Sequence, residues 1–259
     1  METLTERQHI ILKRLVDAHI LSAQPVGSRH LSERYEMHFS PATIRHEMGC
    51  LEEMGYLTHP HTSSGRVPTD SGYRHYVNHC EDERLSLDQR IEEWEQGLSE
   101  ESLRGDRETL AEYTSRMLSA ISEEVGLNVL CDTDAEATQR GRPERLFVQG
   151  ASNLLQKPEF RDREKICALF NAFEEKQELI QWISNRVFGG GVAVVIGREN
   201  EPETFWDCSI ISACYFLDGH KIGTLALIGP RRMHYARSRP LVQGLARMME
   251  RLLEHGDAG

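Results

Sequence analysis

The chain has 259 residues, and its 30 Lys and Arg against 41 Asp and Glu give a net charge of −11, which predicts only modest nonspecific affinity for nucleic acid. Six cysteines without a Cys-x-x-Cys pair argue against a disulfide framework or a zinc knuckle. The polar first residues and the lack of an apolar run of membrane-spanning length predict a cytoplasmic protein with no membrane partner.

The first two predicted helices come early in the chain. Thr5 and Gln8 form a capping-box pair, and an apolar stripe with helical spacing continues from there to Ile20. Ser28 can cap a short second helix that ends near Tyr35. A turn follows and leads into a third helix, which is the order of elements in a helix-turn-helix unit.

The third predicted helix has a well-marked start. Ser40 is suited to the N-cap and Pro41 to the first helical position. Ile44, Met48 and Leu51 recur at i, i+4 and i+7, so we expect them to face a core. The opposite side carries small residues, hydrogen-bonding groups and one arginine, a mixture that lets a helix enter a DNA major groove. These outer residues are Ala42, Thr43, Arg45, His46 and Gly49.

A hairpin is predicted directly after this helix. Short strands at 56–59 and 66–69 flank a polar tip at 61–65, and Thr69 or Asp70 can cap a further helix. A helix-turn-helix followed by such a hairpin is a winged helix, in which the hairpin contacts the DNA backbone or an adjacent minor groove.

The candidate DNA contacts follow from these positions, and they lie in a part of the chain that is nearly neutral. Residues 1–78 hold 8 basic and 9 acidic residues. The predicted base-edge readers are Thr43, Arg45 and His46, the predicted phosphate contact at the helix end is Ser40, and the predicted wing contacts are Ser63, Ser64 and Arg66.

Metal and enzyme functions find little support in the sequence. His59 and His61, with His75 or His79, could be read as a metal site, yet the first two bracket Pro60 and lack helical ligand spacing. Solvated wing histidines that contact phosphate are favoured instead, so we predict no metal site and no cofactor. No Ser/His/Asp or Cys/His constellation can be assembled, so the chain is not predicted to be an enzyme.

The rest of the chain reads as helices followed by a sheet. The predicted helices are at 108–125, 145–156, 160–187 and 239–255, the predicted strands are at 192–196, 208–215 and 222–228, and a loop is predicted at 133–143. Asp218-Gly219 is a strong hairpin signal between the last two strands. The basic segment with Arg231, Arg232, Arg237 and Arg239 is expected to face solvent.

Several motifs resemble one known family. They are residues 25–29 (Pro-Val-Gly-Ser-Arg), 40–45 (Ser-Pro-Ala-Thr-Ile-Arg), 60–69 (Pro-His-Thr-Ser-Ser-Gly-Arg-Val-Pro-Thr), 150–155 (Gly-Ala-Ser-Asn-Leu-Leu) and 228–235 (Ile-Gly-Pro-Arg-Arg-Met-His-Tyr). In these motifs the chain is similar to the HrcA family of bacterial heat-inducible transcription repressors. The resemblance implies repression of chaperone genes at an inverted-repeat operator, a GAF-like second domain, and activity tied to the chaperonin GroEL.

Two departures from the family pattern have consequences. His46 stands where the family usually has Asn, so the base preference at the operator could differ. The chain is also shorter than typical members, and the shortfall lies around 132–143, where the family carries several strands and a dimerisation segment. We therefore expect a reduced GAF-like domain.

Together these observations predict an α+β protein with a winged helix-turn-helix DNA-binding domain at 1–78, a linker helix at 79–106 and a GAF-like regulatory and dimerisation domain at 107–259. A homodimer is expected because two linked copies, each binding one half-site weakly, bind an inverted repeat in double-stranded DNA much more tightly than one copy does. The alternative is a sensor or interaction protein, in which the winged helix binds a protein and the second domain binds a small ligand.

Overall fold

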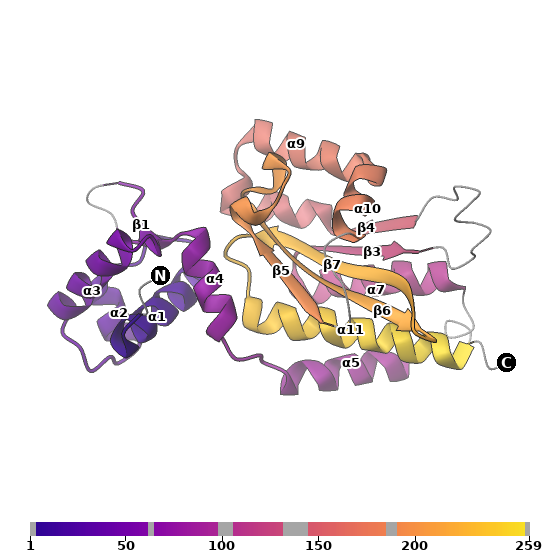
Figure 1. Ribbon diagram of the computed structural model, residues 1–259, viewed down its shortest axis with the longest axis horizontal. Helices are drawn as coiled ribbons and strands as arrows, with labels where there is room; N and C mark the ends of the chain where they lie inside the picture. Colours follow the sequence, from indigo (N-terminus) through magenta and orange to yellow (C-terminus); the bar gives the residue numbers. More distant parts are fainter. Residues whose placement is uncertain (1–3, 62–64, 98–105, 132–144, 185–190, 257–259) are drawn as a thin grey trace. The chain divides into compact units, whose positions relative to one another are not determined.

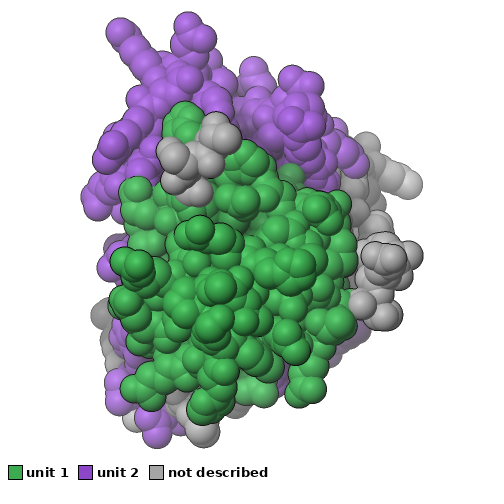
Figure 2. All heavy atoms as spheres, turned by 90° about the vertical axis from the view of Figure 1, so that its left-hand side faces the viewer, with its two compact units in different colours: residues 1–81, 231–234 green, residues 82–230, 235–259 purple. Residues whose placement is uncertain are grey.

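The computed structural model describes residues 4–61, 65–97, 106–131, 145–184 and 191–256 (Figure 1). The chain forms two compact units (Figure 2). Unit 1 comprises residues 1–81 together with Arg231–His234, and unit 2 comprises 82–230 and 235–259. Among the described residues, no helix is long and apolar enough to cross a membrane.

Unit 1 is a winged helix-turn-helix. Its elements are α1 (Glu6–Ser22), α2 (Ser28–Arg34), α3 (Pro41–Glu53), β1 (Leu57–Thr58), β2 (Val67–Pro68) and α4 (Asp70–His79). The predicted order of helices and strands is confirmed, although each strand is only two residues long. β1 and β2 pair antiparallel, and Val26 adds an isolated antiparallel bridge to Arg66.

Local signals set the ends of these helices. The capping box between Thr5 and Gln8 is present at the start of α1, and the Thr69 side chain accepts a hydrogen bond from the Gly72 N–H at the start of α4. The prediction that Ser28 caps α2 is wrong, because the N-cap is Gly27 and no side chain caps this end. Gly55, with φ of +80°, follows α3 and turns the chain towards β1.

Unit 2 is built around one antiparallel sheet with helices on both faces (Figure 1). Its helices are α5 (Leu85–Gly97), α7 (Arg107–Ser122), α9 (Arg163–Glu174), α10 (Lys176–Ser184) and α11 (Tyr235–Gly256). Its strands are β3 (Val125–Leu130), β4 (Arg145–Gln149), β5 (Val192–Ile196), β6 (Cys208–Leu217) and β7 (His220–Pro230), in the spatial order β4-β3-β7-β6-β5. Short 3-10 helices lie at Ala151–Gln156, Pro158–Phe160, Gly197–Glu199 and Glu203–Phe205.

Alternate residues of β3 show how the two faces are covered. Leu127 is fully buried in an apolar cluster that contains residues of α9 and α10. The next position, Gly126, faces the opposite side of the sheet. A Cβ atom placed there would lie 2.2 Å from the Ser115 carbonyl oxygen of α7. Because side chains alternate across a strand, helices must cover both sides of the sheet. All six residues of β3 are accordingly buried.

Several sequence predictions for unit 2 are wrong in detail. The helix predicted at 145–156 is the strand β4 followed by a 3-10 helix. The helix predicted at 160–187 is divided into α9 and α10 by Glu175, whose ψ of 64° is not helical. The strand β3 was not predicted, and the loop predicted at 133–143 lies outside the described residues.

The predicted strands at the end of the chain are confirmed. β5, β6 and β7 cover the predicted segments, and the hairpin turn is at Asp218-Gly219 as expected. Both turn residues have positive φ, 50° and 78°, as a two-residue hairpin turn requires. The α+β fold class is therefore confirmed.

Candidate nucleic-acid interface

The candidate interface is centred on α3, whose sequence fixes both its start and its inner face. The Ser40 hydroxyl accepts a hydrogen bond from the Thr43 N–H at 3.1 Å, and Pro41 occupies the first helical position. Ile44 and Leu51 are fully buried. The apolar stripe thus holds one side of α3 against the core of unit 1 and leaves the other side outside.

The predicted base-edge readers lie on this outer side. Arg45 and His46 are exposed, and Thr43 is half-buried. The Thr43 hydroxyl lies 2.9 Å from the Ser40 hydroxyl, and His46 Nε2 lies 3.9 Å from Cys50 Sγ. Arg45 has no hydrogen bond or ion pair with any other described residue. Its guanidinium group is therefore available to an external acceptor.

α1 sets the orientation of α3 through one carboxylate. Arg7 Nη1 lies 3.3 Å from Glu47 Oε1, and the Gln8 side-chain amide donates to Glu47 Oε2 at 3.1 Å. The Arg7 guanidinium also lies over the Phe39 ring, 5.5 Å from its centroid, in the turn before α3. This support could not be predicted from the sequence, because Gln8 and Glu47 are 39 positions apart and no local pattern joins them.

The base of the wing is tied to the end of α3. Arg66 Nε lies 2.7 Å from Glu52 Oε2, with the Arg66 side chain 26% exposed, and His59 contacts the other oxygen of Glu52. The backbone of Arg66 also exchanges hydrogen bonds with Val26, at 2.8 and 2.9 Å. Arg66 is thus an anchored residue of the wing. Ser63 and Ser64 lie outside the described residues.

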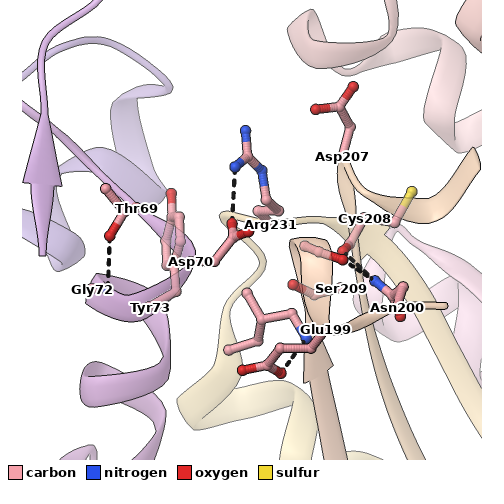
Figure 3. A network of polar contacts seen from close by, with 12 residues as sticks. Thr69, Asp70, Gly72, Tyr73, Glu199, Asn200, Asp207, Cys208, Ser209 and Arg231 are labelled. Atoms are coloured by element: carbon pink, nitrogen blue, oxygen red, sulfur yellow. Dashed lines mark hydrogen bonds and ion pairs between the residues drawn. The ribbon is translucent and has the colours of Figure 1, made fainter. Parts of the chain in front are cut away.

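A short segment from late in the chain completes unit 1. Arg231 Nη1 donates to Asp70 in the first turn of α4 at 2.9 Å (Figure 3). Arg232 donates to the carbonyl oxygen of Ile20 at the end of α1, at 3.2 Å. The expectation that this basic segment simply faces solvent is wrong for these two arginines, because each bonds a group far away in the sequence.

A polar network of a different kind lies in unit 2. The buried Asn200 amide donates to the carbonyl oxygens of Gly197, Phe205 and Cys208, at 2.8 to 3.1 Å (Figure 3). It therefore closes the loop between β5 and β6 on itself. Arg239 pairs with Asp82, with 2.6 Å between Nη2 and Oδ1, so it too departs from the solvent-facing expectation. Both sets of contacts are structural.

Comparisons with known proteins match nearly all of the chain. The family model described as "HrcA protein C terminal domain" matches residues 83–238. A heat-inducible transcription repressor HrcA of Shouchella clausii is 31% identical over 342 residues, covering 96% of this chain and 98% of that protein. The protein of the same name from Halalkalibacterium halodurans is 30% identical over 337 residues, with the same coverage.

These alignments are longer than the chain itself, which has 259 residues. The relatives therefore carry residues without a counterpart here, in line with the expected shortfall. A solved structure described as a hypothetical protein at 2.2 Å resolution has a TM-score of 0.73 and covers 98% of this chain and 100% of that chain. At 19% identity this likeness shows a shared fold alone.

Proposed function

The chain belongs to the HrcA family of heat-inducible transcription repressors, and we propose that it represses chaperone genes by inserting α3 into the major groove of an inverted-repeat operator. Its function is transcription repression in the heat-shock response, its second unit is a GAF-like α+β domain, and its partner is DNA. The family is not a class of enzymes. The inverted-repeat operator, the individual DNA contacts and the homodimer are what we propose beyond this.

The exposed outer side of α3 is the observation that supports this proposal most. A reading helix needs side chains that reach base edges without being held by the protein itself. Arg45 meets this requirement, because it is exposed and has no partner among the described residues. An arginine in this setting suits the two acceptors of guanine. We assign Thr43 and His46 beside it to neighbouring base edges.

Ser40 has a different proposed role. Its hydroxyl oxygen already caps the Thr43 N–H, so it marks the positive end of the α3 dipole. A DNA phosphate at this helix end would accept hydrogen bonds from the Ser40 hydroxyl and from the backbone N–H groups that the helix leaves free. Such a contact positions α3 on the duplex without reading sequence.

The wing contacts combine one anchored residue with two serines. We propose that Arg66 keeps its ion pair with Glu52 through Nε and donates from its terminal N–H groups to a phosphate, since a guanidinium has five donors. Ser63 and Ser64 are proposed to contact the same backbone strand. His46 stands where the family usually has Asn, so we expect an operator that differs from the common one at the base it contacts.

The proposed assembly is a cytoplasmic homodimer. Two copies of α3 would occupy two half-sites of an inverted repeat, and the symmetry of such a site mirrors a two-fold protein. We place the dimer contacts in the GAF-like unit and GroEL among the regulatory partners, because the family resemblance implies both.

An electrophoretic mobility shift tests this proposal. The protein is titrated onto a chaperone-promoter inverted repeat, onto the same duplex with one half-site scrambled, and onto a fully scrambled duplex. We expect the highest affinity for the intact inverted repeat, a lower affinity for the duplex with one scrambled half-site and the lowest for the fully scrambled duplex. The preference for the intact site should persist at raised salt. Equal affinity for all three duplexes would contradict sequence-specific binding and would favour a protein-binding winged helix.

A further inference from the structure

Three histidines of unit 1 come together at one end of the α1–α4 pair. His9 lies on α1, and His75 and His79 lie one turn apart on α4. Their nearest side-chain ligand atoms all lie within 4.8 Å of one another. Among the described residues, this is the one group of three or more His, Cys, Asp or Glu side chains with that spacing.

Ring nitrogens of the three residues lie close to one another. His9 Nδ1 lies 2.9 Å from His75 Nε2. The rings of His75 and His79 are stacked with centroids 4.2 Å apart, and the centroid of His9 is 4.9 Å from that of His79. Spacing of i and i+4 on one helix face is a common geometry for two ligands of one ion.

The tautomer of His79 is fixed by its hydrogen bond. Its Nδ1 lies 2.7 Å from the carbonyl oxygen of His75. A carbonyl only accepts, so Nδ1 carries the proton and Nε2 of the neutral ring keeps its lone pair. Histidines that bind metal ions typically donate their second ring nitrogen to a backbone carbonyl in this way, which fixes the orientation of the ring.

We propose that His9, His75 and His79 bind one divalent transition-metal ion, with Zn²⁺ as the representative, and that water completes the coordination. Neutral imidazole nitrogens suit zinc, nickel and copper, and three protein ligands with an open position are an established zinc arrangement. A zinc–nitrogen distance of about 2.1 Å requires tetrahedral nitrogens roughly 3.4 Å apart. His9 Nδ1 and His75 Nε2 therefore need to separate by about 0.5 Å, and ligand atoms as far apart as 4.8 Å need to approach by about 1.4 Å, which partly exposed rings can do.

The surroundings of His9 and His75 favour their neutral forms. Burial, followed by the neighbouring His79, lowers the pKa of both His9 and His75. Lys13, on α1, further lowers the pKa of His9 and would weaken cation binding somewhat by repulsion. The Tyr56 ring packs edge-on against His75, with centroids 5.5 Å apart, and adds no charge. At neutral pH both of these rings are thus uncharged, as metal binding requires, and binding should weaken on acidification.

A bound ion would add a link between α1 and α4 near the start of α1, beside the contact of His9 with His75. At the other end, Tyr76 donates to Asp17 at 2.7 Å, and the Tyr73 hydroxyl lies 2.7 Å from His19 Nδ1. An ion between His9 and the two histidines of α4 would fix the first turns of α1 as well. The expected consequence is a metal-dependent rise in the thermal stability of unit 1.

The test is a titration of the full-length, metal-free chain with Zn²⁺ by calorimetry and with Co²⁺ by visible absorption. We expect one equivalent per chain, and a loss of affinity of at least about tenfold in His9→Gln and in His79→Gln, because losing a direct ligand costs at least as much as losing its hydrogen-bond partner. His79 is exposed, so its variant should fold even where a change at His75 does not.

The double variant His59→Gln/His61→Gln is the matched control, since it removes two exposed wing imidazoles and leaves the cluster intact. The proposal predicts unchanged binding in this control. Three results would overturn it: no binding by the wild-type chain at millimolar metal, unchanged affinity in both cluster variants, or a loss of affinity confined to the wing control.

A thermal measurement separates a real site from scattered surface binding. All three tryptophans, Trp94, Trp182 and Trp206, belong to unit 2, so their fluorescence does not report on unit 1. One equivalent of Zn²⁺ should raise the circular-dichroism transition of unit 1 and leave the tryptophan transition in place. A shift of the tryptophan transition alone would contradict the assigned ligands. Neither result depends on DNA binding.

Discussion

The two units use polar side chains in opposite ways. In unit 2 one group of buried polar side chains is bonded internally: the Tyr215 hydroxyl donates to Asn128 at 2.9 Å, and the Asn128 amide donates to Thr114 at 2.9 Å. In unit 1 the core is made by apolar stripes of helices, and Arg45 and His46 remain on the outer side of α3. We therefore propose that unit 1 functions through the side chains that its fold leaves exposed, whereas we expect the polar network of unit 2 to contribute stability.

The largest expected effect comes from the two apolar cores. Leu51→Ala removes a fully buried side chain of α3, and we expect a loss of about 2–5 kcal/mol in the unfolding free energy of unit 1. The circular-dichroism transition of unit 1 should fall while the tryptophan transition does not. Leu127→Ala in β3 is the matched variant and should have the reverse effect. A parallel fall of both transitions in both variants would contradict separate cores.

The buried network of unit 2 should respond next. Asn128→Ala leaves the hydroxyl of Tyr215 without its acceptor in a fully buried position, and each orphaned group costs about 1–3 kcal/mol. Urea unfolding followed by tryptophan fluorescence measures this loss. The control Asn171→Ala, at an exposed position of α9 in the same unit, should change stability by less than about 0.5 kcal/mol. Equal effects of the two variants would argue against a structural network.

Substitutions on the outer side of α3 should weaken DNA binding without lowering the stability of unit 1. Arg45→Ala should cost about 1–3 kcal/mol of operator affinity and relax the preference at one base pair. Arg66→Ala should weaken binding to operator and scrambled duplexes more evenly, because a phosphate contact carries no sequence information. Fluorescence anisotropy on both duplexes measures the difference. Equal losses on operator and scrambled DNA for Arg45→Ala would refute its assigned role.

The smallest effect is a pH dependence confined to unit 1. Burial, with His79 and His9 nearby, lowers the pKa of His75 from 6.5 to about 4. The unfolded chain therefore binds a proton between these values while the folded chain does not. The contribution of neutral His75 to the stability of unit 1 should be fully present above pH 6.5. It should be lost progressively as the pH falls towards 4.

Thermal midpoints measured in the presence of a chelator test this dependence. His75→Gln should flatten the decline of the unit 1 transition, and His30→Gln, at an exposed position of α2, should not. If the stability of unit 1 declines equally in both variants, titrating groups other than His75 cause the decline.

The sequence predicted unit 1 far better than unit 2, and the reason is physical. The start of α3 depends on Ser40, Pro41 and the stripe that follows, which all lie within four turns of helix. β3 is buried on both faces, so it lacks the period-two alternation that identifies a strand. The helix predicted at 145–156 has a different cause: β4 is an edge strand of half-buried and exposed residues, so it shows no alternation of buried and exposed positions, and a 3-10 helix follows it directly.

The candidate interface was predictable only where its determinants are local. The exposure of Arg45 and His46 follows from their position opposite the stripe of α3, and the structure confirms it. The pairing of Arg66 with Glu52 depends on the fold of the wing against α3. The cluster of His9 with two histidines of α4 requires the packing of helices 66 residues apart, which no spacing in the sequence reveals.

The most direct test of the central claim is footprinting on genomic DNA from the protein's own source with two proteins, the wild-type chain and the triple variant Thr43→Ala/Arg45→Ala/His46→Ala. The account predicts that the wild type protects two symmetric half-sites upstream of chaperone genes. The triple variant should keep its circular-dichroism spectrum and lose this protection. Protection of the same sites by the triple variant would contradict the claim that the outer side of α3 reads the operator.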